Sequence, residues 1–307
     1  MTFGGGITMV NELIHDPCAE LVAVCDKYVP LLDHCREVAE GAGLNHVAYY
    51  ERFDDFIEHD MDAVVLANYA NEHVPFGIRL MESGRHIMTE CLTCSTMAEA
   101  VQLIECVERT GKVYSYAENY CYFDGHFALR QMVEDGKIGE VVSLEGDFYN
   151  DCSAKWHMLT RGIRNHWRNF VPSTFYCTHS IAPMFYATGL RATKVNGLEI
   201  PRMDYMAEGG ARSGSAAMEV MELSNGGMAR STHGNLRYPY TTTIRLIGAD
   251  GSIESDSETV KYYRANGSGG FEITSYKASF VDFPYRNHAD CGAIGNGDYS
   301  AVGFFLA

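Results

Sequence analysis

The sequence predicts an α/β fold made of two domains. Its first part alternates short apolar runs with helical patterns, the order typical of a doubly wound parallel sheet. Its second part is dominated by strand-like runs separated by turn signals, which predicts an α+β domain with an open, mostly antiparallel sheet. A length of 307 residues also suggests about two domains. We expect these domains to cover residues 1–119 and 120–307.

Composition disfavours several classes of function. With 40 acidic against 24 basic residues, the net charge of -16 argues against a nucleic-acid partner, because phosphate contacts need basic patches. No apolar run is long enough to cross a membrane, and we expect no membrane partner. The 10 cysteines are scattered in apolar or helical context, which favours reduced thiols and a cytoplasmic protein.

A glycine-rich stretch at the start predicts a nucleotide site. Gly4, Gly5 and Gly6 lead directly into a helical pattern, and the apolar run 21–25 then ends at Asp26. Glycines let the backbone approach a pyrophosphate, and the free N–H groups of a helix start bind phosphate. A carboxylate after the next strand can accept a hydrogen bond from a ribose hydroxyl. This order favours a dinucleotide site over a glycine-rich tail, and Asp26 favours NAD because it would repel the 2′-phosphate of NADP.

Both ends of the chain predict a fragment. A dinucleotide fold needs a strand immediately before its glycine loop, and only Met1, Thr2 and Phe3 precede it here. We therefore expect the first strand of the sheet to be missing, and the remaining chain to be poorly stable because neighbouring strand edges lose their partner. The C-terminal run 304–307 resembles a helix that stops without a capping residue.

The other elements of the first domain follow in alternation. Helices are expected over 30–41, 53–59, 72–83 and 96–110, with Pro30 in a first turn and glycines after two of the ends. Strands are expected over 46–50, 62–68, 85–89 and 113–117. Right-handed crossovers between such strands give the arrangement known as a Rossmann fold.

The pattern changes near residue 120. One more helix is expected over 125–135, and strands over 140–149, 216–223, 228–233, 241–247 and 252–254. The Gly-Ala-Asp-Gly sequence at 248–251 is a turn signal between two of these strands. The open face of such a sheet would expose apolar surface, so we expect a homo-oligomer.

Polar residues follow three of the expected parallel strands. Ligands of such sheets bind outside the carboxyl ends of the strands, so we expect a shared cleft there, although each residue could also be a loop residue in water. Glu118 follows the last of the three strands. The expected cofactor contacts are Asn68, His73, Glu90 and Asn119, and the expected substrate contact is Cys91.

Cys91 and Cys94 form a Cys-x-x-Cys spacing. A zinc site would need a second pair of ligands, and the sequence shows no clear pair. A redox site would need a helix to start just after the first cysteine, whereas Ser95 and Thr96 fit the cap of the next helix. We therefore expect no metal.

Several motifs resemble a known family. The segment 67–73, the run Gly-Arg-His-Ile-Met-Thr-Glu at 84–90 and the run Gly-Lys-Ile-Gly-Glu-Val at 136–141 are similar to the Gfo/Idh/MocA oxidoreductases. The resemblance runs over almost the whole chain. It implies a Rossmann domain followed by an open-sheet domain, NAD or NADP as cofactor, and hydride transfer at a sugar or cyclitol carbon.

Two positions depart from that family. Its Glu-Lys-Pro motif reads Glu90-Cys91-Leu92 here, without the lysine that helps to orient the substrate and activate its hydroxyl. Its Asp-x-x-x-His pair falls on Phe175 and His179, which leaves His179 without that aspartate.

Further motifs resemble the NAD-dependent glycoside hydrolases that include α-N-acetylgalactosaminidases. The similar segments are 118–122, 145–148, 166–168, 176–179 and 239–240. In that branch bound NAD transiently oxidises the sugar at C3, the glycosidic bond leaves by elimination, water adds back and the hydride returns.

The resemblance to this branch implies roles for individual residues. Carried over by position, His179 assists the C3 hydroxyl, while Tyr176, Arg168 and Tyr240 hold the sugar. Imidazole also suits acid-base work near neutral pH on chemical grounds. Each of the four has a structural alternative: a histidine bonded to backbone, an arginine that anchors a loop against an acidic residue at 151 or 145, or aromatic core.

The position of the base for the C2 proton departs from this branch. The tyrosine with that role falls on Phe148, which cannot take a proton. Tyr149 is the remaining candidate, although adjacent residues of a strand face opposite sides. Alternatively, this protein uses a different reaction from that of the branch.

Three hypotheses follow. The first is an NAD-dependent oxidoreductase that acts by hydride transfer on a sugar or sugar derivative. The alternative is a glycoside hydrolase that uses the same bound NAD with no net redox change. The third is a non-catalytic nucleotide or sugar sensor.

Overall fold

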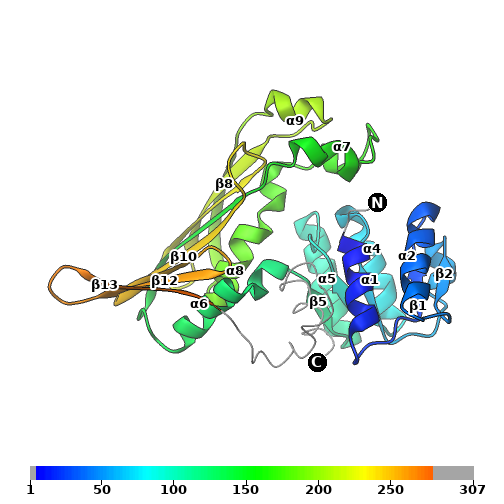
Figure 1. Ribbon diagram of the computed structural model, residues 1–307, viewed down its shortest axis with the longest axis horizontal. Helices are drawn as coiled ribbons and strands as arrows, with labels where there is room; N and C mark the ends of the chain where they lie inside the picture. The colour runs from blue at the N-terminus through cyan, green and yellow to red at the C-terminus, as the bar shows by residue number, and fades with distance from the viewer. Residues whose placement is uncertain (1–4, 279–307) are drawn as a thin grey trace. The chain divides into compact units, whose positions relative to one another are not determined.

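The computed structural model describes residues 5–278 (Figure 1). These residues form two compact units, of which the first ends at Ala117 and the second begins at Glu118. The division falls two residues before the expected start of the second domain at position 120. Gly4 and the run 304–307 lie outside the described residues.

The first unit alternates helices with parallel strands. Its helices are α1 (Gly5–His15), α2 (Val29–Gly41), α3 (Phe53–Phe56), α4 (His73–Glu82) and α5 (Met97–Thr110), and a 3-10 turn, η1 (Ala70–Glu72), precedes α4. Its strands are β1 (Ala23–Cys25), β2 (Ala48–Tyr50), β3 (Ala63–Leu66), β4 (His86–Thr89) and β5 (Tyr114–Tyr116). Every element expected in this part is present, and the strands are shorter than expected.

The five strands form two separate parallel sheets. One pairs β1 with β2, and the other has the order β3-β4-β5. In a dinucleotide fold with the strand order 3-2-1-4-5-6, the first strand lies between two such groups. Among residues 5–278 no strand takes that position. The unit therefore shows the two flanks of a Rossmann sheet.

Helix α5 shows how local sequence sets the bounds of an element. The Thr96 hydroxyl accepts the Glu99 N–H, and the Glu99 carboxylate accepts the Thr96 N–H, so a capping box begins the helix. Gly111 ends it in the left-handed conformation, with a φ of 64°. The buried face of α5 packs with α4, β3 and β4 in one apolar core.

The second unit is built on an eight-stranded sheet. Its strands are β6 (Val141–Tyr149), β7 (Ala192–Glu199), β8 (Ala216–Leu223), β9 (Met228–Gly234), β10 (Thr241–Gly248), β11 (Gly251–Ser255), β12 (Thr259–Ala265) and β13 (Phe271–Lys277). Their order is β13-β12-β11-β10-β6-β9-β8-β7, and all neighbours are antiparallel except β6 and β9. The mostly antiparallel sheet expected from the sequence is thus confirmed.

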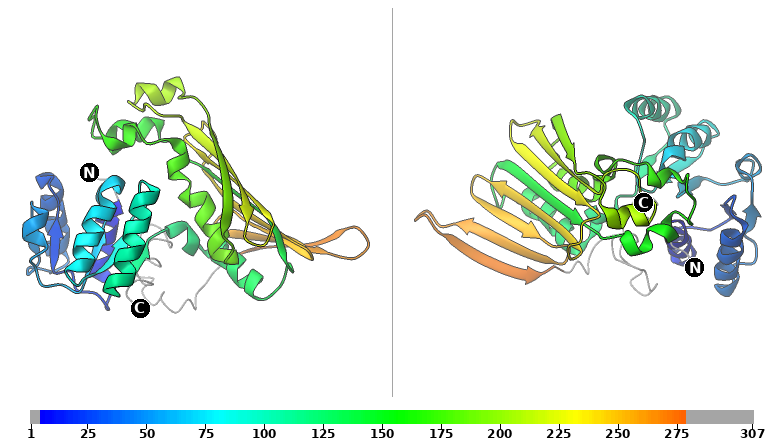
Figure 2. Two further views of the ribbon diagram at one scale, coloured as in Figure 1. Left: turned by 180° about the vertical axis from the view of Figure 1, so that it is seen from behind. Right: turned by 90° about the horizontal axis from the view of Figure 1, so that it is seen from above.

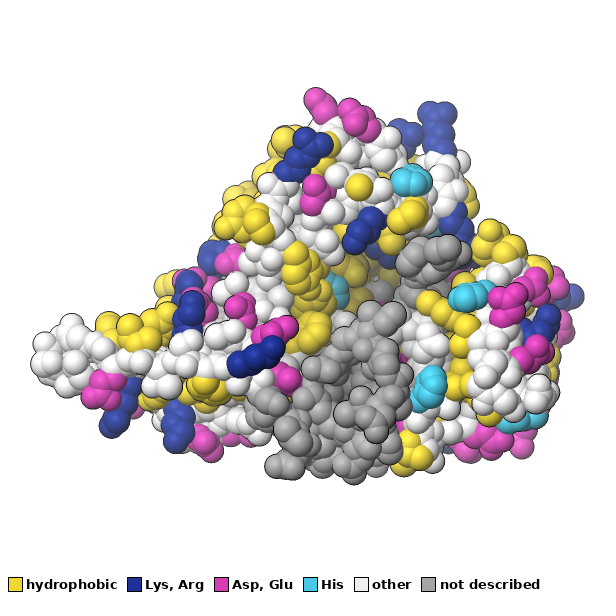
Figure 3. All heavy atoms as spheres, in the orientation of Figure 1, with side chains coloured by type: hydrophobic (Ala, Val, Ile, Leu, Met, Phe, Trp, Pro, Cys, Tyr) yellow, Lys and Arg dark blue, Asp and Glu magenta, His cyan; other side chains and the backbone are white. Residues whose placement is uncertain are grey.

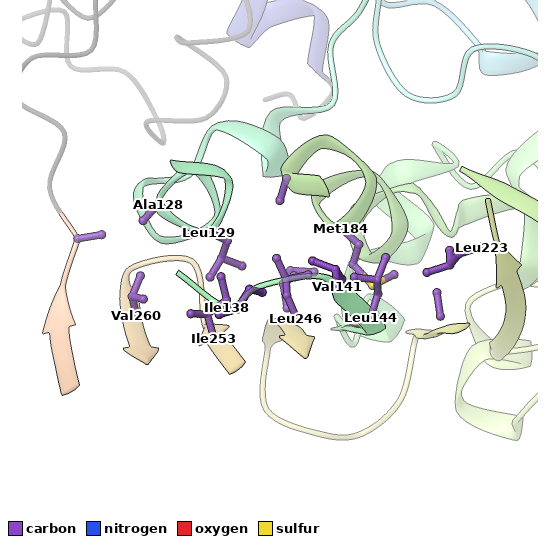
Figure 4. Close-up of a cluster of buried hydrophobic side chains, with 14 of the residues drawn as sticks. Ala128, Leu129, Ile138, Val141, Leu144, Met184, Leu223, Leu246, Ile253 and Val260 are labelled. Atoms are coloured by element: carbon purple, nitrogen blue, oxygen red, sulfur yellow. The ribbon is translucent and has the colours of Figure 1, made fainter. Parts of the chain in front are cut away.

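The described part of the second unit also contains four helices and four 3-10 turns. The helices are α6 (Asp124–Glu134), α7 (Trp156–Leu159), α8 (Thr178–Thr188) and α9 (Asp204–Glu208), and the 3-10 turns are η2 (Asn119–Tyr122), η3 (Ser153–Lys155), η4 (Trp167–Asn169) and η5 (Ser173–Tyr176). Figures 1 and 2 show α6 and α8 side by side on the same face. Beneath them Leu129, Leu144, Met184, Leu246 and Ile253 form a fully buried core (Figure 4).

Helix α8 approaches the sheet closely at Gly146 of β6. A Cβ atom at this position would lie 2.2 Å from the Ser180 carbonyl oxygen and 3.2 Å from Cε of Met184. A side chain would therefore force helix and strand apart. Gly146 sets the depth at which α8, and with it His179, lies on the sheet.

Four long elements of the second unit were not expected. Helix α8 buries residues on several sides and contains Pro183, so its sequence shows no simple apolar stripe. Strands β7 and β13 expose nearly all of their residues and lack the alternation that marks a half-buried strand. Strand β12 alternates only at its start.

Candidate functional site

A carboxylate and an imidazole form a buried pair in the second unit. Glu118 precedes η2, and His179 lies in the first turn of α8. Nδ1 of His179 lies 2.7 Å from Oε1 of Glu118, and the two side chains are 9% and 3% exposed. An ionised carboxylate can only accept, so Nδ1 carries the hydrogen and Nε2 of the neutral ring carries a lone pair. Nε2 faces the Tyr176 hydroxyl at 3.2 Å.

Glu118 is held in its charged form. Burial alone would raise the pKa of this carboxyl, but contacts with His179, Thr178 and Tyr120 outweigh burial and hold the pKa below its usual value. The Thr178 hydroxyl donates to Oε2, and the Tyr120 N–H donates to Oε1 at 3.2 Å. At neutral pH a fixed negative charge therefore lies behind the imidazole.

This pair supplies a carboxylate that the family motif does not provide here. Phe175 stands where the family has an aspartate, so His179 is without that aspartate. Glu118 supplies the carboxylate from a segment 61 positions earlier. The sequence marked Glu118 as a polar residue after a strand, but the residue that it would meet could not be read from the sequence.

Aromatic rings surround the imidazole. The Tyr120 ring lies 4.2 Å from the His179 ring, nearly parallel at 31°, and the Phe148 ring meets His179 edge-on at 4.7 Å. The Tyr120 hydroxyl lies 2.5 Å from that of Tyr240. Burial raises the pKa of both phenols, so both hydroxyls keep their hydrogens at neutral pH. The structure thus brings together His179, Tyr176 and, through Tyr120, the half-exposed Tyr240.

Tyr149 lies on the opposite face of the sheet. Its ring packs against Tyr238 at 5.6 Å, and its hydroxyl lies 3.5 Å from the Asp147 carboxylate. The pleat of β6 sends Phe148 toward α8 and Tyr149 away from it. The structure does not bring Tyr149 to His179, which corrects its inclusion among the catalytic residues.

Arg168 lies in η4 and is partly buried. Its guanidinium lies 4.9 Å from the centre of the Trp167 ring. Within residues 5–278 it forms no ion pair, and neither Asp151 nor Glu145 anchors it. The loop-anchoring alternative is therefore not observed, and Arg168 stays a candidate for binding a polar ligand.

The strand ends of the first unit form one edge. Strands β3, β4 and β5 end in register, and the Glu90 N–H donates to the Leu66 carbonyl at 2.9 Å. Asn68 follows β3 and donates from its amide to Glu72 at 3.3 Å. Cys91 directs its thiol toward the Ala117 carbonyl, 4.0 Å away. Asn119 opens η2 and belongs to the second unit.

His73 is buried beneath these loops. Its Nδ1 lies 2.7 Å from the Leu92 carbonyl oxygen and its Nε2 lies 3.3 Å from the Asn68 carbonyl oxygen. Burial lowers the pKa of this histidine, and the contacts with the two carbonyls offset part of that effect. His73 ties the loops after β3 and β4 together, so it supports the edge from below and does not present its ring to a ligand, contrary to expectation.

The cysteines at 91 and 94 show no redox pairing. Neither forms a disulfide. Burial raises the pKa of Cys94, which leaves little reactive thiolate at neutral pH. The helix that follows begins after Thr96, as the capping residues predicted.

The start of α1 and the end of β1 fit a dinucleotide. Because α1 begins at Gly5, the N–H groups of its first turn have no partner within the helix. A Cβ atom on Gly6 would lie 3.5 Å from Cβ of Ala67, so this turn lies against the end of β3. Asp26 follows β1 and accepts the Tyr28 N–H at 2.7 Å, while its carboxylate retains further acceptor capacity. Phosphate donors and a ribose acceptor are thus both present.

Comparison with known proteins finds a family model that is similar to this part of the chain. Residues 4–118 match the model of the Gfo/Idh/MocA family, described as an oxidoreductase family with an NAD-binding Rossmann fold. The N-terminal part of the chain is thus similar to the NAD-binding Rossmann domain of this family. The expectations of a Rossmann domain and of NAD are confirmed.

Several curated relatives carry the name of one glycoside hydrolase family. The chain is 26% identical over 263 residues to glycosyl hydrolase family 109 protein 1 of Bacteroides thetaiotaomicron, which covers 79% of this chain and 56% of the relative. It is 24% identical over 276 residues to a glycosyl hydrolase family 109 protein of Saccharopolyspora erythraea, which covers 81% of this chain and 60% of the relative. The chain therefore spans little more than half the length of these relatives.

Solved structures share the fold. Levoglucosan dehydrogenase in complex with NADH and L-sorbose matches with a TM-score of 0.77 and 18% identity, over 99% of this chain and 87% of that one. The scyllo-inositol dehydrogenase of Lactobacillus casei matches with a TM-score of 0.72 and 18% identity, over 98% and 83%. At these identities the likeness establishes the fold. No helix within residues 5–278 has the length and apolar character to cross a membrane.

Proposed function

We propose that the protein is an NAD-dependent oxidoreductase that acts by hydride transfer on a carbon of a sugar or sugar derivative. The observation that carries this proposal is the Glu118–His179 pair, which leaves Nε2 of a buried imidazole ready to accept a proton. Oxidation of an alcohol releases a hydride from carbon and a proton from the hydroxyl. Bound NAD supplies the hydride acceptor, and the protein supplies the base.

His179 takes the hydroxyl proton at Nε2. The resulting imidazolium is stabilised by the Glu118 carboxylate, which also fixes the tautomer through Nδ1. Tyr176 lies within hydrogen-bond distance of Nε2 and orients the substrate hydroxyl there. Tyr240 and Arg168 would hold other hydroxyls of the sugar.

The first unit holds the cofactor. The first turn of α1, with Gly4, Gly5 and Gly6, would bind the pyrophosphate, and Asp26 would accept a ribose hydroxyl. We assign further contacts to residues that follow the strands. These are Asn68 and Glu90 in the first unit and Asn119 in the second for the cofactor, and Cys91 for the substrate.

The test is a turnover assay on a panel of sugars and cyclitols. We expect NADH to form with at least one free sugar, and NAD to raise the melting temperature. Release of an aglycone from aryl glycosides without added cofactor and without net NADH would contradict the oxidoreductase. Binding of NAD with no turnover on any sugar would instead support the sensor, which the missing lysine and Phe148 favour.

The glycoside hydrolase is the second candidate. The names of the relatives at 26% and 24% identity favour it. The same His179 would serve the transient oxidation at C3, but the residue that would remove the C2 proton falls on Phe148. Net NADH from a free sugar would exclude this candidate.

We further propose that the protein is a cytoplasmic homo-oligomer that associates through the uncovered face of its sheet. Val220 and Leu198 are 51% and 77% exposed there, and Figure 3 shows apolar side chains beside charged ones on this unit. Light scattering should give a multiple of the chain mass, and Val220→Arg should reduce it. A monomer would contradict the proposal. The cysteines described within residues 5–278 form no disulfide, which supports a cytoplasmic location.

A further inference from the structure

A second carboxylate and imidazole, distinct from the pair described above, lie buried under η5. Glu219 of β8 and His233 of β9 face η5, which packs on both strands. Their side chains are 5% and 2% exposed, and Oε2 of Glu219 lies 3.3 Å from Nδ1 of His233. Neither carboxylate oxygen has a hydrogen bond of ordinary geometry from residues 5–278, although contacts with Ser231 and the backbone offset part of the effect of burial on the pKa of Glu219. An ionised carboxylate that is buried without a hydrogen-bond donor would lower the free energy of unfolding.

The hydrogens around His233 can be assigned. Nε2 lies 2.8 Å from the Ser173 carbonyl oxygen, which can only accept, so Nε2 carries a hydrogen. Ser180 donates to the Cys177 carbonyl at 3.0 Å, and the Ser231 hydroxyl lies 2.8 Å from Ser180 Oγ. With the Ser180 hydrogen used, Ser231 donates to Ser180. Ser231 Oγ also lies 3.3 Å from Nδ1 but has no hydrogen left for it.

The surroundings favour a neutral pair. Burial raises the pKa of Glu219 to about 7, and burial lowers the pKa of His233. Three other titratable groups face the pair. Cys177 faces Glu219, and burial raises the pKa of its thiol to about 12, while Glu199 and His179 face His233. Among the described residues no lysine or arginine forms an ion pair with Glu219.

We propose that Glu219 is a buried carboxylic acid that donates its hydrogen to Nδ1 of His233, and that the two residues position Tyr176 and His179. This hydrogen bond gives Nδ1 of His233 a donor, which neither the Ser180 hydroxyl nor the Ser231 hydroxyl supplies. His233 then remains neutral and donates through Nε2 to the Ser173 carbonyl. Glu219 and His233 act as positioning residues. The positioning role rests on the proposed function, whereas the protonation of Glu219 does not.

Ser173 connects His233 to the segment that carries Tyr176 and His179. All of its polar groups are held: its N–H by the Glu199 carboxylate, its hydroxyl by the Gly214 carbonyl at 2.6 Å, and its carbonyl by His233. Ser173 starts η5, Tyr176 ends it, and α8 begins two residues later. The fixed carbonyl therefore anchors the short segment that carries both side chains of the site.

The pH dependence of stability tests the protonation. The pKa of Glu219 is higher in the folded protein than the ordinary value of 4.5 in the unfolded chain. Its stabilising contribution is therefore complete below 4.5 and is lost as the pH rises through about 7. Glu219→Gln keeps a donor for Nδ1 and cannot ionise. We expect the melting temperature of the wild type to fall relative to Glu219→Gln between about pH 5 and about pH 8.

A matched control lies on the same strand. Glu222 is exposed and pairs with Lys194, so Glu222→Gln should follow the wild-type curve in the upper part of that range. Parallel curves for the wild type and Glu219→Gln would overturn the protonation. Ring nitrogen chemical shifts give a second readout, because His233 should show the neutral Nε2–H tautomer below about pH 7. An imidazolium signal there would also overturn it.

Turnover tests the positioning. Glu219→Leu removes the donor and should lower kcat by about tenfold or more with little change in KM, because the segment shifts the base. Glu219→Gln should retain most of the wild-type kcat that Glu219→Leu loses. Its kcat should also fall less steeply than that of the wild type as the pH rises through about 7. A wild-type kcat in Glu219→Leu would overturn the positioning role. If no sugar is turned over, the proposed function fails, while the melting curves and the nitrogen shifts still decide the protonation.

Discussion

Nδ1 of His179 lies 2.7 Å from Oε1 of Glu118, so two residues 61 positions apart form one buried pair. The Thr178 hydroxyl and the Tyr120 N–H also donate to this carboxylate. The charge of Glu118 and the tautomer of His179 thus depend on each other. Removing either side chain should affect the chemistry of the site in a distinct way.

Replacing Glu118 by glutamine should impair catalysis. The amide keeps the shape of the side chain but removes the charge that stabilises an imidazolium, and its N–H₂ group favours the wrong tautomer. We expect kcat for sugar oxidation to fall by about a hundred- to ten-thousandfold, measured as NADH formation. Glu140→Gln, on an exposed glutamate of the same unit, is the control. Wild-type turnover in Glu118→Gln would remove the carboxylate from the mechanism.

The same substitution predicts a change in acid stability. Burial acts to raise the pKa of Glu118, but His179, Thr178 and Tyr120 together lower it below the ordinary value of 4.5. A lowered pKa gives a stabilisation that is present above 4.5 and is lost as the pH falls through the folded value. The difference in melting temperature between the wild type and Glu118→Gln should therefore shrink on acidification. A constant difference would show that the carboxylate is not stabilised in its charged form.

Replacing His179 by alanine should separate catalysis from cofactor binding. We expect turnover to fall by about a hundred- to ten-thousandfold, the usual contribution of a general base. The dissociation constant for NADH, measured by fluorescence, should stay within about threefold because the proposed phosphate and ribose contacts lie in the first unit. His157→Ala, on an exposed histidine, is the control. Turnover by His179→Ala would assign the base to another residue.

The sequence allowed the fold to be predicted where local signals are strong. The capping residues Thr96 and Glu99 begin α5 where expected, and Gly111 ends it. The alternation of β6 also predicted that Phe148 and Tyr149 face opposite sides. Helix α8 was missed because burial on several sides removes the stripe that identifies a helix at a protein surface.

The site was predicted only in part, because its contacts join distant segments. His179 and Tyr176 could be named from their motif, and Glu118 from its place after a strand. Their pairing depends on how η2 and α8 pack, which no local pattern encodes. His73 shows the converse error: its place in a loop suggested a ligand contact, whereas it is buried against two carbonyls.

Asp26 should determine the choice of dinucleotide. Asp26→Asn keeps an oxygen for the Tyr28 N–H but removes the charge that would repel a 2′-phosphate. We expect the dissociation constant for NAD to rise by about tenfold or more, because a hydrogen bond to a charged group is lost. The dissociation constant for NADP should fall, because the charge that repels its 2′-phosphate is gone. Calorimetric titration with both dinucleotides measures the ratio. Asp33→Asn on the exposed side of α2 is the control, and an unchanged ratio would place the ribose elsewhere.

Gly146 should be intolerant of any side chain. Gly146→Ala places a Cβ 2.2 Å from the Ser180 carbonyl oxygen, so α8 must move away from β6. We expect the free energy of unfolding to fall by about 1–3 kcal/mol, the usual cost of overpacking, and kcat to fall because His179 moves with the helix. Gly41→Ala is the matched control: no atom lies within 4 Å of its Cβ position, and alanine in a helix should add about 0.5–1 kcal/mol. Equal unfolding free energies for wild type and Gly146→Ala, measured in urea, would show that the helix does not depend on this close approach.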